Sequence, residues 1–303
     1  MSMRARPVML DAPSNLGLRP PAAGVVPGVY KGPWALREAG LLAALNARDG
    51  GTVIPPRYES AWEPGTGVRN GDAIVRYAKK LAARIKALLS EGDFPIVIGG
   101  DCSILLGSML ALHARGRHGL VFLDGHSDFR HPGNTDDVVA AAGEDLALVT
   151  GRGDPRLLAL AAGPLVRDSD VFVAGPRETD EHLAELADLG VPLLTSRAVK
   201  SLGPAEAARR IFGHVERPEL EGFWIHLDWD ILDGSLLPAV DCPEPDGVDH
   251  ALLSNLLGML VSSPRCVGIE CTIYDPDLDE DGRYATELSS CLARALNQNV
   301  GHG

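Results

Sequence analysis

The chain has few cysteines and no long hydrophobic run. Five cysteines occur among 303 residues, an odd number without close spacing, which excludes the disulfide framework of small secreted domains. No stretch approaches about 18 consecutive apolar residues, and the N-terminal segment lacks the apolar core of a secretory leader. We therefore predict no membrane association and a reducing, cytoplasmic location.

The chain is also short of basic residues. Lys and Arg total 28 against 41 Asp and Glu, which gives a formal net charge of −13. Proteins that bind nucleic acids generally present a basic face to the phosphate backbone. A nucleic-acid partner is therefore not predicted, and a small molecule is the expected ligand.

Seven short apolar runs recur along the chain and have the β-rich, nearly continuous hydrophobicity of strands that are covered on both faces. They lie at 7–11, 94–100, 119–124, 170–175, 191–195, 223–228 and 266–270. Helical patterns lie between them, at 34–47, 71–90, 103–115, 178–189, 204–214, 249–261 and 284–297. The segment 11–33, with five prolines and four glycines, predicts a loop over the surface.

This alternation of strands and helices predicts the fold class. It favours a single α/β domain over residues 1–303, with three layers (α/β/α) around a mostly parallel central sheet. In such a sheet, ligands bind beyond the carboxyl ends of the strands. The residues that follow each apolar run are therefore the first place to look for a functional site.

Polar groups do follow four of these runs. The groups are a thiol, an imidazole and several carboxylates, namely Cys102, Asp124, His126, Asp128, Asp228, Asp230 and Glu270. Because the carboxyl ends of parallel strands meet at one edge of a sheet, we expect these side chains to converge.

Side chains alternate between the two faces of an extended chain, so the three donors of "DGHSD" (124–128) can share one face, as can Asp228 and Asp230. Five donors are more than one ion needs, which favours two divalent metals about 3.5–4 Å apart. Oxygen-rich ligation with an imidazole favours Mn²⁺. The alternative is a set of solvated loop acids with a structural His, but so many unpaired carboxylates at one edge would repel one another.

Four motifs resemble, in order and spacing, those of the ureohydrolase family, which contains arginase, agmatinase and formiminoglutamase. They are "GGDCS" (99–103), "DGHSD" (124–128), "HLDWDILDGSLLPAVDCPEPDG" (226–247) and "GIECTIYDP" (268–276). The segment "GVYKGPWALREAGL" (28–41) is similar to the opening of the family. The resemblance implies a three-layer parallel α/β fold and a homo-oligomer, a trimer or a hexamer.

The resemblance also implies six metal ligands: Asp124 and Asp228 to both ions, Cys102 and Asp128 to the first ion, and His126 and Asp230 to the second. It implies that Glu270 holds the guanidinium or amidine group of a substrate. We also predict that Arg130 and Asp180 contact the substrate. Arg130 stands where arginases have an Asn that binds the amino-acid end, so it either binds a carboxylate differently or is a surface cation.

The chain departs from the family pattern at several positions. Cys102 replaces a metal-binding His, and its softer thiolate opens Zn²⁺, Fe²⁺ or Ni²⁺ as alternatives to Mn²⁺. The alternative is a buried Cys102 that binds no metal and leaves a weakened first site. His226 stands where Ser or Thr is common, either supporting the site or serving as a buried structural His. Ala142 lies near the position of a His that shuttles protons in arginases, and Glu144 or His131 is left as a substitute.

The function predicted is a dinuclear-metal hydrolase of a linear C–N bond in a guanidino or amidino compound, which releases urea or a related amide. Attack by a metal-bridging hydroxide, oriented by Asp128 and directed at a carbon held by Glu270, is the expected chemistry. N-hydroxyguanidino and formimino substrates stay open. The alternatives are a catalytically silent module of the same fold and a deacylase, which usually has one metal and does not need paired bridging aspartates.

Overall fold

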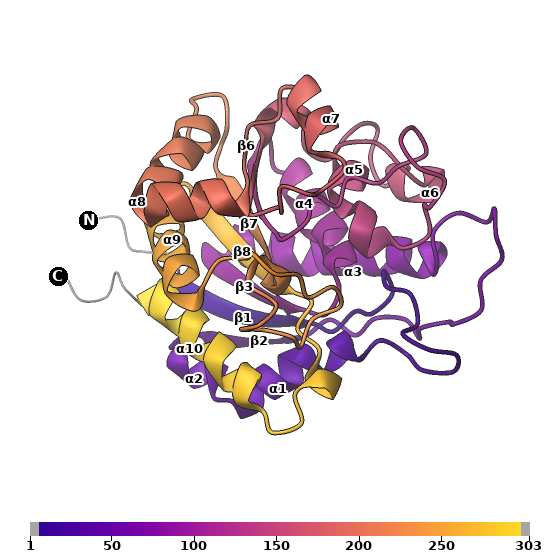
Figure 1. The fold of residues 1–303 in the computed structure, drawn as a ribbon, viewed down its shortest axis with the longest axis horizontal. Helices are drawn as coiled ribbons and strands as arrows, with labels where there is room; N and C mark the ends of the chain where they lie inside the picture. Colours follow the sequence, from indigo (N-terminus) through magenta and orange to yellow (C-terminus); the bar gives the residue numbers. More distant parts are fainter. Residues whose placement is uncertain (1–5, 298–303) are drawn as a thin grey trace.

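The centre of the molecule is an eight-stranded sheet in a computed structural model that describes residues 6–297 (Figure 1). The strand order is β2-β1-β3-β8-β7-β4-β5-β6, and the neighbouring strands pair in parallel. The strands are β1 (Arg6–Ala12), β2 (Arg48–Thr52), β3 (Asp93–Gly99), β4 (Gly119–Leu123), β5 (Val171–Ala174), β6 (Leu193–Leu194), β7 (Phe223–Asp228) and β8 (Cys266–Thr272). The predicted α/β fold class is therefore confirmed.

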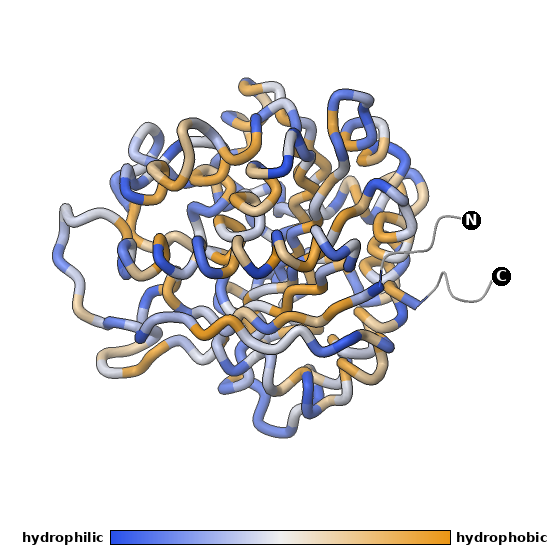
Figure 2. The backbone as a smooth tube through the Cα atoms, turned by 180° about the vertical axis from the view of Figure 1, so that it is seen from behind, coloured by the Kyte–Doolittle hydropathy of each residue, from blue (hydrophilic) through white to orange (hydrophobic). Residues whose placement is uncertain are grey.

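Helices cover both faces of the sheet. One apolar layer joins the sheet to α1 (Gly32–Glu38), α2 (Leu41–Ala44), α8 (Ser196–Val215), α9 (His250–Ser262) and α10 (Arg283–Asn297). The other joins it to α3 (Gly71–Ser90), α4 (Leu105–His113), α5 (Asp145–Val149), α6 (Pro155–Leu158) and α7 (Leu183–Asp188). Hydrophobic residues concentrate along the central strands, whereas hydrophobic and hydrophilic residues alternate along the outer helices (Figure 2). This double cover explains why the strand sequences are almost continuously apolar.

Several helix boundaries differ from the pattern-based prediction. The helix predicted over 34–47 is divided into α1 and α2, because Gly40 between them has φ +83°. Helix α8 begins at Ser196, well before the predicted 204, and Gly203 interrupts it with φ +73°. The short elements β2, α5 and α6 were not predicted, since four or five residues are too few to show a period.

The loop predicted over 11–33 does not lie wholly on the surface. Residues 14–18 are buried, and the Ser14 hydroxyl donates a hydrogen bond of 2.7 Å to Asp101 Oδ2 beyond the end of β3. The segment leaves β1 and crosses the carboxyl edge of the sheet before it reaches the surface. It therefore forms part of the wall around the site.

The sheet order shows where a ligand site can form. After β3 the chain continues to β4, and β8 and β7 fill the gap between these two strands at the centre of the sheet. The connections diverge at such a point, which leaves a crevice beyond the strand ends. The predicted polar groups lie at or beyond the ends of these same four strands, except Glu270, which lies within β8.

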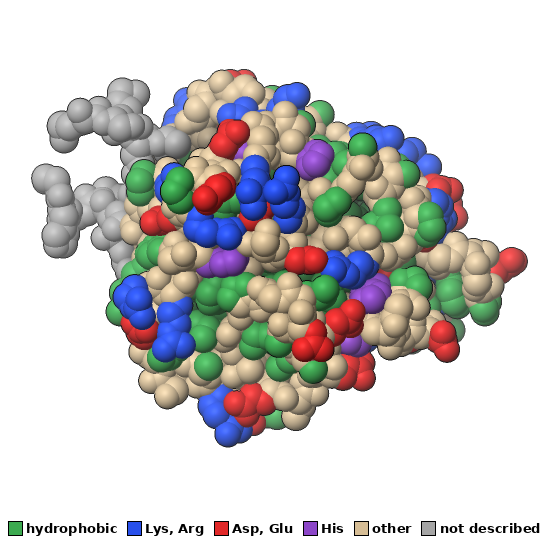
Figure 3. Space-filling view, turned by 90° about the horizontal axis from the view of Figure 1, so that it is seen from above, with side chains coloured by type: hydrophobic (Ala, Val, Ile, Leu, Met, Phe, Trp, Pro, Cys, Tyr) green, Lys and Arg blue, Asp and Glu red, His purple; other side chains and the backbone are tan. Residues whose placement is uncertain are grey.

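The predictions about nucleic-acid and membrane partners can be compared with the molecular surface and with the helices. Acidic, basic and hydrophobic side chains are intermixed on the face that Figure 3 shows. Within residues 6–297, no helix is both long enough and apolar enough to cross a membrane.

Candidate metal centre

The loop after β4 carries the first half of the site. Asp124 is fully buried, and its Oδ1 accepts a hydrogen bond of 2.6 Å from the backbone N–H of His126. This bond turns the chain sharply at the strand end. Asp128 then adopts φ +44°, a left-handed conformation that is uncommon for a residue with a side chain. Such strain is typical of functional positions held in place by their surroundings.

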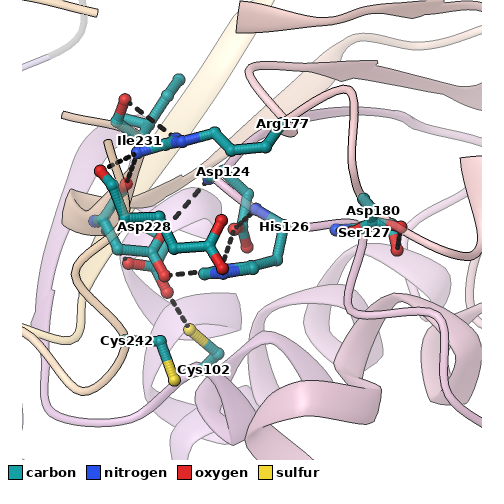
Figure 4. Close-up of polar contacts among 12 residues, drawn as sticks. Cys102, Asp124, His126, Ser127, Arg177, Asp180, Asp228, Ile231 and Cys242 are labelled. Atoms are coloured by element: carbon teal, nitrogen blue, oxygen red, sulfur yellow. Dashed lines mark hydrogen bonds and ion pairs between the residues drawn. The ribbon is translucent and has the colours of Figure 1, made fainter. Parts of the chain in front are cut away.

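The end of β7 supplies the second half. Asp228 Oδ1 accepts a hydrogen bond of 2.8 Å from the N–H of Asp230 and so caps the short 3₁₀ helix Trp229–Ile231. Asp230 reaches across to the other half, with Oδ2 2.8 Å from His126 Nδ1 and Oδ1 accepting from the N–H of Gly125 at 3.0 Å. The two motifs therefore meet, as Figure 4 shows for His126, Asp124 and Asp228.

Cys102 joins this group from the segment after β3. Its side chain is fully buried, and the thiol donates to Asp228 Oδ2 at 2.9 Å (Figure 4). The thiol also lies 3.1 Å from Thr272 Oγ1. Burial, together with the charge of Asp228, raises the pKa of the Cys102 thiol well above its ordinary value. A bound cation acts in the opposite direction, because it stabilises the thiolate.

The crowded carboxylates shift one another's protonation. Burial and neighbouring charges raise the pKa of Asp124 and Asp228 well above the ordinary value, and the pKa of Asp128 to about 7. Burial lowers the pKa of His126, but the charges of Asp230 and Asp128 outweigh it and raise the value to about 10. Strongly shifted pKa values of this kind are characteristic of functional sites.

These donors fit a pair of divalent cations. Asp124 Oδ2 is buried and has no hydrogen-bond partner within residues 6–297. Asp124 belongs to two sets of three donors whose ligand atoms lie within 4.8 Å of one another: Asp124, His126 and Asp128, and Asp124, Asp228 and Asp230. Buried carboxylates are stable only when they are paired, protonated or bound to a metal.

A cavity of about 480 Å³ opens above these groups. Arg130 and Asp180, both predicted to contact the substrate, line it together with Cys102, His126, Asp128, Asp228 and Asp230. Asp180 uses both oxygens to hold the loop: Oδ2 accepts from the N–H of Ser127 at 2.7 Å, and Oδ1 from its hydroxyl at 2.8 Å (Figure 4). Arg130 is exposed at the cavity.

Glu270 does not lie where the resemblance implied. It is fully buried, does not line the cavity, and bonds to His226 Nδ1 at 2.8 Å and to the Ser108 hydroxyl. The predicted strand stopped at Glu270, whereas β8 continues to Thr272. The wall position at this strand end therefore belongs to Ile273, whose φ is +74°. The prediction that Glu270 contacts the substrate is not supported by this placement.

The two residues left as substitutes for the missing proton shuttle also lie elsewhere. His131 Nε2 contacts Glu185 Oε1 at 2.9 Å, and its Nδ1 accepts from the N–H of Gly133 at 3.0 Å. Glu144 is buried and accepts from the N–H of Ala140. Ala142 lines the cavity, but neither Glu144 nor His131 does.

Arg177 is a site residue that sequence reasoning missed. It is buried and donates to backbone carbonyl oxygens of 230–245, including Asp230 at 3.0 Å and Leu232 at 2.9 Å. Arg177 comes shortly after strand β5, in "VAGPR" (173–177). A charged residue just beyond the end of an apolar run was the sequence signal that could have identified it. A Cβ on Gly125 would lie 2.6 Å from Arg177 Nη1, so this glycine is needed for the arginine to fit.

Known proteins share this fold and sequence pattern. An arginase-family model matches residues 21–297. The arginase of Brevibacillus brevis is 30% identical over 279 residues, which cover 88% of this chain and 92% of that protein. The structure of arginase from Bacillus caldovelox matches with a TM-score of 0.86 and 25% identity, over 96% of this chain and 98% of that one. Formimidoylglutamase from Bacillus subtilis shares the fold, with a TM-score of 0.74, 20% identity and coverage of 97% and 86%.

The matched region includes every motif that carries the candidate site. Members of the matching family are hydrolases that act on C–N bonds in linear amidines, and the relatives cover nearly the whole chain. The chain therefore belongs to the arginase family.

Proposed function

We propose that this protein is a dinuclear-metal hydrolase of a linear C–N bond in a guanidino or amidino compound. The observation that carries the proposal is the convergence of Cys102, Asp124, His126, Asp128, Asp228 and Asp230 below one cavity. The buried Asp124 Oδ2, which has no hydrogen-bond partner within residues 6–297, supports cation binding in particular.

The proposed ions are two Mn²⁺, because most of the donors are oxygens with one imidazole. The thiol of Cys102 leaves Zn²⁺, Fe²⁺ and Ni²⁺ as alternatives. When bound, such ions lower the pKa of water to about 7, which supplies a nucleophile strong enough for a resonance-stabilised guanidinium carbon.

Asp128 is the proposed proton acceptor for the attacking water. Asp128 lines the cavity and has a left-handed backbone conformation. It lies on the same loop as Asp124 and His126. A carboxylate held in this way orients the water by a hydrogen bond and removes its proton as the C–O bond forms.

Acidic groups on the loop after β7 are the proposed binding partners of the substrate cation, in place of Glu270. Asp241 and Glu244 line the cavity, and Glu244 Oε1 lies 3.9 Å from His126 Nε2. Charge-assisted hydrogen bonds from a planar guanidinium to these carboxylates would place its carbon over the metal donors. Arg130 is proposed to bind an anionic group at the other end of the substrate.

His182 is the proposed donor of the proton that the leaving amine requires. It lines the cavity, and its Nε2 has no hydrogen-bond partner within residues 6–297, although Glu181 Oε1 lies 3.5 Å away. A His in this position can take up the role for which the family His is missing near Ala142.

The test is a substrate screen on the protein loaded with Mn²⁺ and, separately, with Zn²⁺, Fe²⁺ or Ni²⁺. Urea, amine or formamide release is measured from L-arginine, agmatine, N-hydroxy-L-arginine and N-formimino-L-glutamate. Turnover that Asp128→Asn abolishes and His182→Gln lowers supports the proposal. Full metal binding without turnover on any of these classes favours the silent module, which the replacements at Cys102 and Ala142 motivate.

The location and assembly are proposed as well. We propose a cytoplasmic protein, which is supported by the absence of disulfide bonds among the five cysteines within residues 6–297. We also propose a trimer or hexamer, in keeping with the resemblance to the ureohydrolases.

A further inference from the structure

A second polar cluster lies beneath the cavity floor, between the sheet and helices α4 and α5. His226 of β7 is paired in register with Glu270 of β8 on one side and with Phe122 of β4 on the other. Asp145, the first residue of α5, faces them from the helix layer, and Ser108 of α4 contacts Glu270. His226, Asp145 and Glu270 are all fully buried.

His226 is oriented as a metal-binding histidine would be. Its Nδ1 donates to Glu270 Oε1 at 2.8 Å, and Glu270 Oε2 in turn accepts from the Ser108 hydroxyl. The Phe122 ring stacks on the imidazole with centroids 4.7 Å apart and an interplanar angle of 15°. A proton on Nδ1 leaves a lone pair on Nε2, and a carboxylate on the opposite nitrogen strengthens that ligand. Nε2 has no hydrogen-bond partner within residues 6–297.

Asp145 is aimed at that nitrogen. Neither of its carboxylate oxygens has a hydrogen-bond partner within the described chain, and Oδ2 lies 3.6 Å from His226 Nε2. This separation is too long for a direct N–H···O hydrogen bond, which spans about 2.7–3.2 Å. The two groups therefore face each other at ion-pair distance without a hydrogen bond, which leaves room for a third group that binds both.

Cys102 supplies the remaining donor. Its Sγ, the Asp145 carboxylate and a ring nitrogen of His226 all lie within 4.8 Å of one another. In a tetrahedral site with Zn–N, Zn–O and Zn–S bonds of about 2.0–2.3 Å, ligand atoms are separated by about 3.3–3.6 Å. The 3.6 Å between Asp145 and His226 matches such an edge.

We propose that Cys102, Asp145 and His226 bind a divalent cation of the Zn²⁺ type, at a position deeper than the proposed pair. One sulfur, one nitrogen and one oxygen donor suit Zn²⁺ or Fe²⁺ better than Mn²⁺. Cys102 also contacts Asp228, so its thiolate can be shared with the pair. The proposal does not rest on the hydrolase function, because it concerns binding alone.

Anomalous diffraction from crystals of the wild-type protein soaked in ZnCl₂ tests it directly. We expect a zinc peak bounded by the three side chains, about 2.3 Å from Cys102 Sγ and about 2.0 Å from His226 Nε2. Zinc peaks confined to Asp124, Asp228 and Asp230 would overturn the proposal. This experiment needs no variant and no enzymatic activity.

Cobalt spectroscopy in solution gives an independent readout. Co²⁺ added to the metal-free wild type is expected to give the near-ultraviolet charge-transfer absorption of a cobalt thiolate. Because Cys102 can also serve the pair, Asp145→Asn and His226→Thr are each expected to weaken this absorption, to lower the Co²⁺ bound by one ion per chain and to lower Co²⁺ affinity at this site by more than about tenfold. The matched control is Cys271→Ala, which removes another buried thiol from β8 and should leave the absorption unchanged.

Two outcomes contradict the proposal. An unchanged thiolate absorption and an unchanged number of bound Co²⁺ ions in both His226→Thr and Asp145→Asn would assign Cys102 to the pair of sites alone. Absence of the absorption in the wild type would show that Cys102 binds no metal. Circular dichroism and cooperative thermal unfolding identify variants that fail to fold, and the zinc peak in wild-type crystals then decides.

Discussion

Cys102 connects the predicted metal pair with the deeper cluster, because its thiol lies 2.9 Å from Asp228 and within 4.8 Å of donors on Asp145 and His226. We predict that Cys102→Ala lowers bound Mn²⁺ from about two ions per chain towards one, since the first site loses its only non-carboxylate ligand. Elemental analysis after dialysis measures this content. Cys102→Ser is the size-matched control, and equal metal content in wild type and both variants would contradict ligation by Cys102.

Glu270 acts through its buried hydrogen bonds. We predict that Glu270→Ala lowers the free energy of unfolding by about 2–4 kcal/mol, because His226 Nδ1 and the Ser108 hydroxyl both lose a buried partner. Urea denaturation measures the loss, and Ser108→Ala should cost about 1 kcal/mol. A Glu270→Ala protein with unchanged stability and a KM raised tenfold or more would restore the substrate contact implied by the resemblance.

Asp128 makes the stability of the metal-free protein dependent on pH. Burial and the neighbouring Asp230 raise its pKa to about 7, above the ordinary 3.8, so the folded state binds its proton more tightly than the unfolded state. This contribution is complete below about pH 4 and is lost as the pH rises through 7. We predict that the melting temperature of chelator-treated protein falls between pH 5 and 8, as followed by calorimetry. Asp128→Asn should flatten this decline, and an unchanged slope would argue against it.

At the scale of elements, Arg177 holds the segment after β7 against the strand ends. Its guanidinium donates to five carbonyl oxygens, those of Asp230, Ile231, Leu232, Glu244 and Pro245. The segment 230–245, which carries Asp241 in the cavity wall, is therefore hydrogen-bonded at both of its ends to the Arg177 side chain.

We predict that Arg177→Lys raises amide hydrogen exchange about tenfold in 231–246, because an ammonium cannot reproduce the planar array of donors. Hydrogen-exchange mass spectrometry measures it, with helix α9 as the internal reference. Gly125→Ala should have a similar effect, since its Cβ would lie 2.6 Å from Arg177 Nη1. Equal exchange in wild type and both variants would show that the segment is held by other contacts.

At the scale of the whole molecule, the prediction concerns the number of subunits in the assembly. We predict that sedimentation velocity gives a mass three or six times 32.1 kDa. Large apolar side chains stand exposed on the described surface, among them Trp34 at 71% and Ile54 at 74%, and burial of such groups stabilises association. A monomer at micromolar concentration would contradict the prediction, and the measurement is repeated after metal removal as a control.

The sequence by itself determined the fold class and the convergence of the polar side chains of the two acidic motifs. Continuous apolar runs such as those of β3 and β7 are local signals of buried parallel strands, and the polar residues that follow them meet at one edge of any such sheet. The approach of Asp230 to His126 follows from that rule without knowledge of the tertiary structure.

The tertiary structure alone decided the register and the facing of elements that are distant in sequence. Two more residues in β8 move Glu270 from the cavity wall to a buried bond with His226 and bring Ile273 to the wall instead. Likewise, nothing near Asp145 in the sequence indicates that a five-residue helix aims its carboxylate at β7. Strand length, helix placement and long-range packing depend on the whole core, so the second cluster could be recognised only in three dimensions.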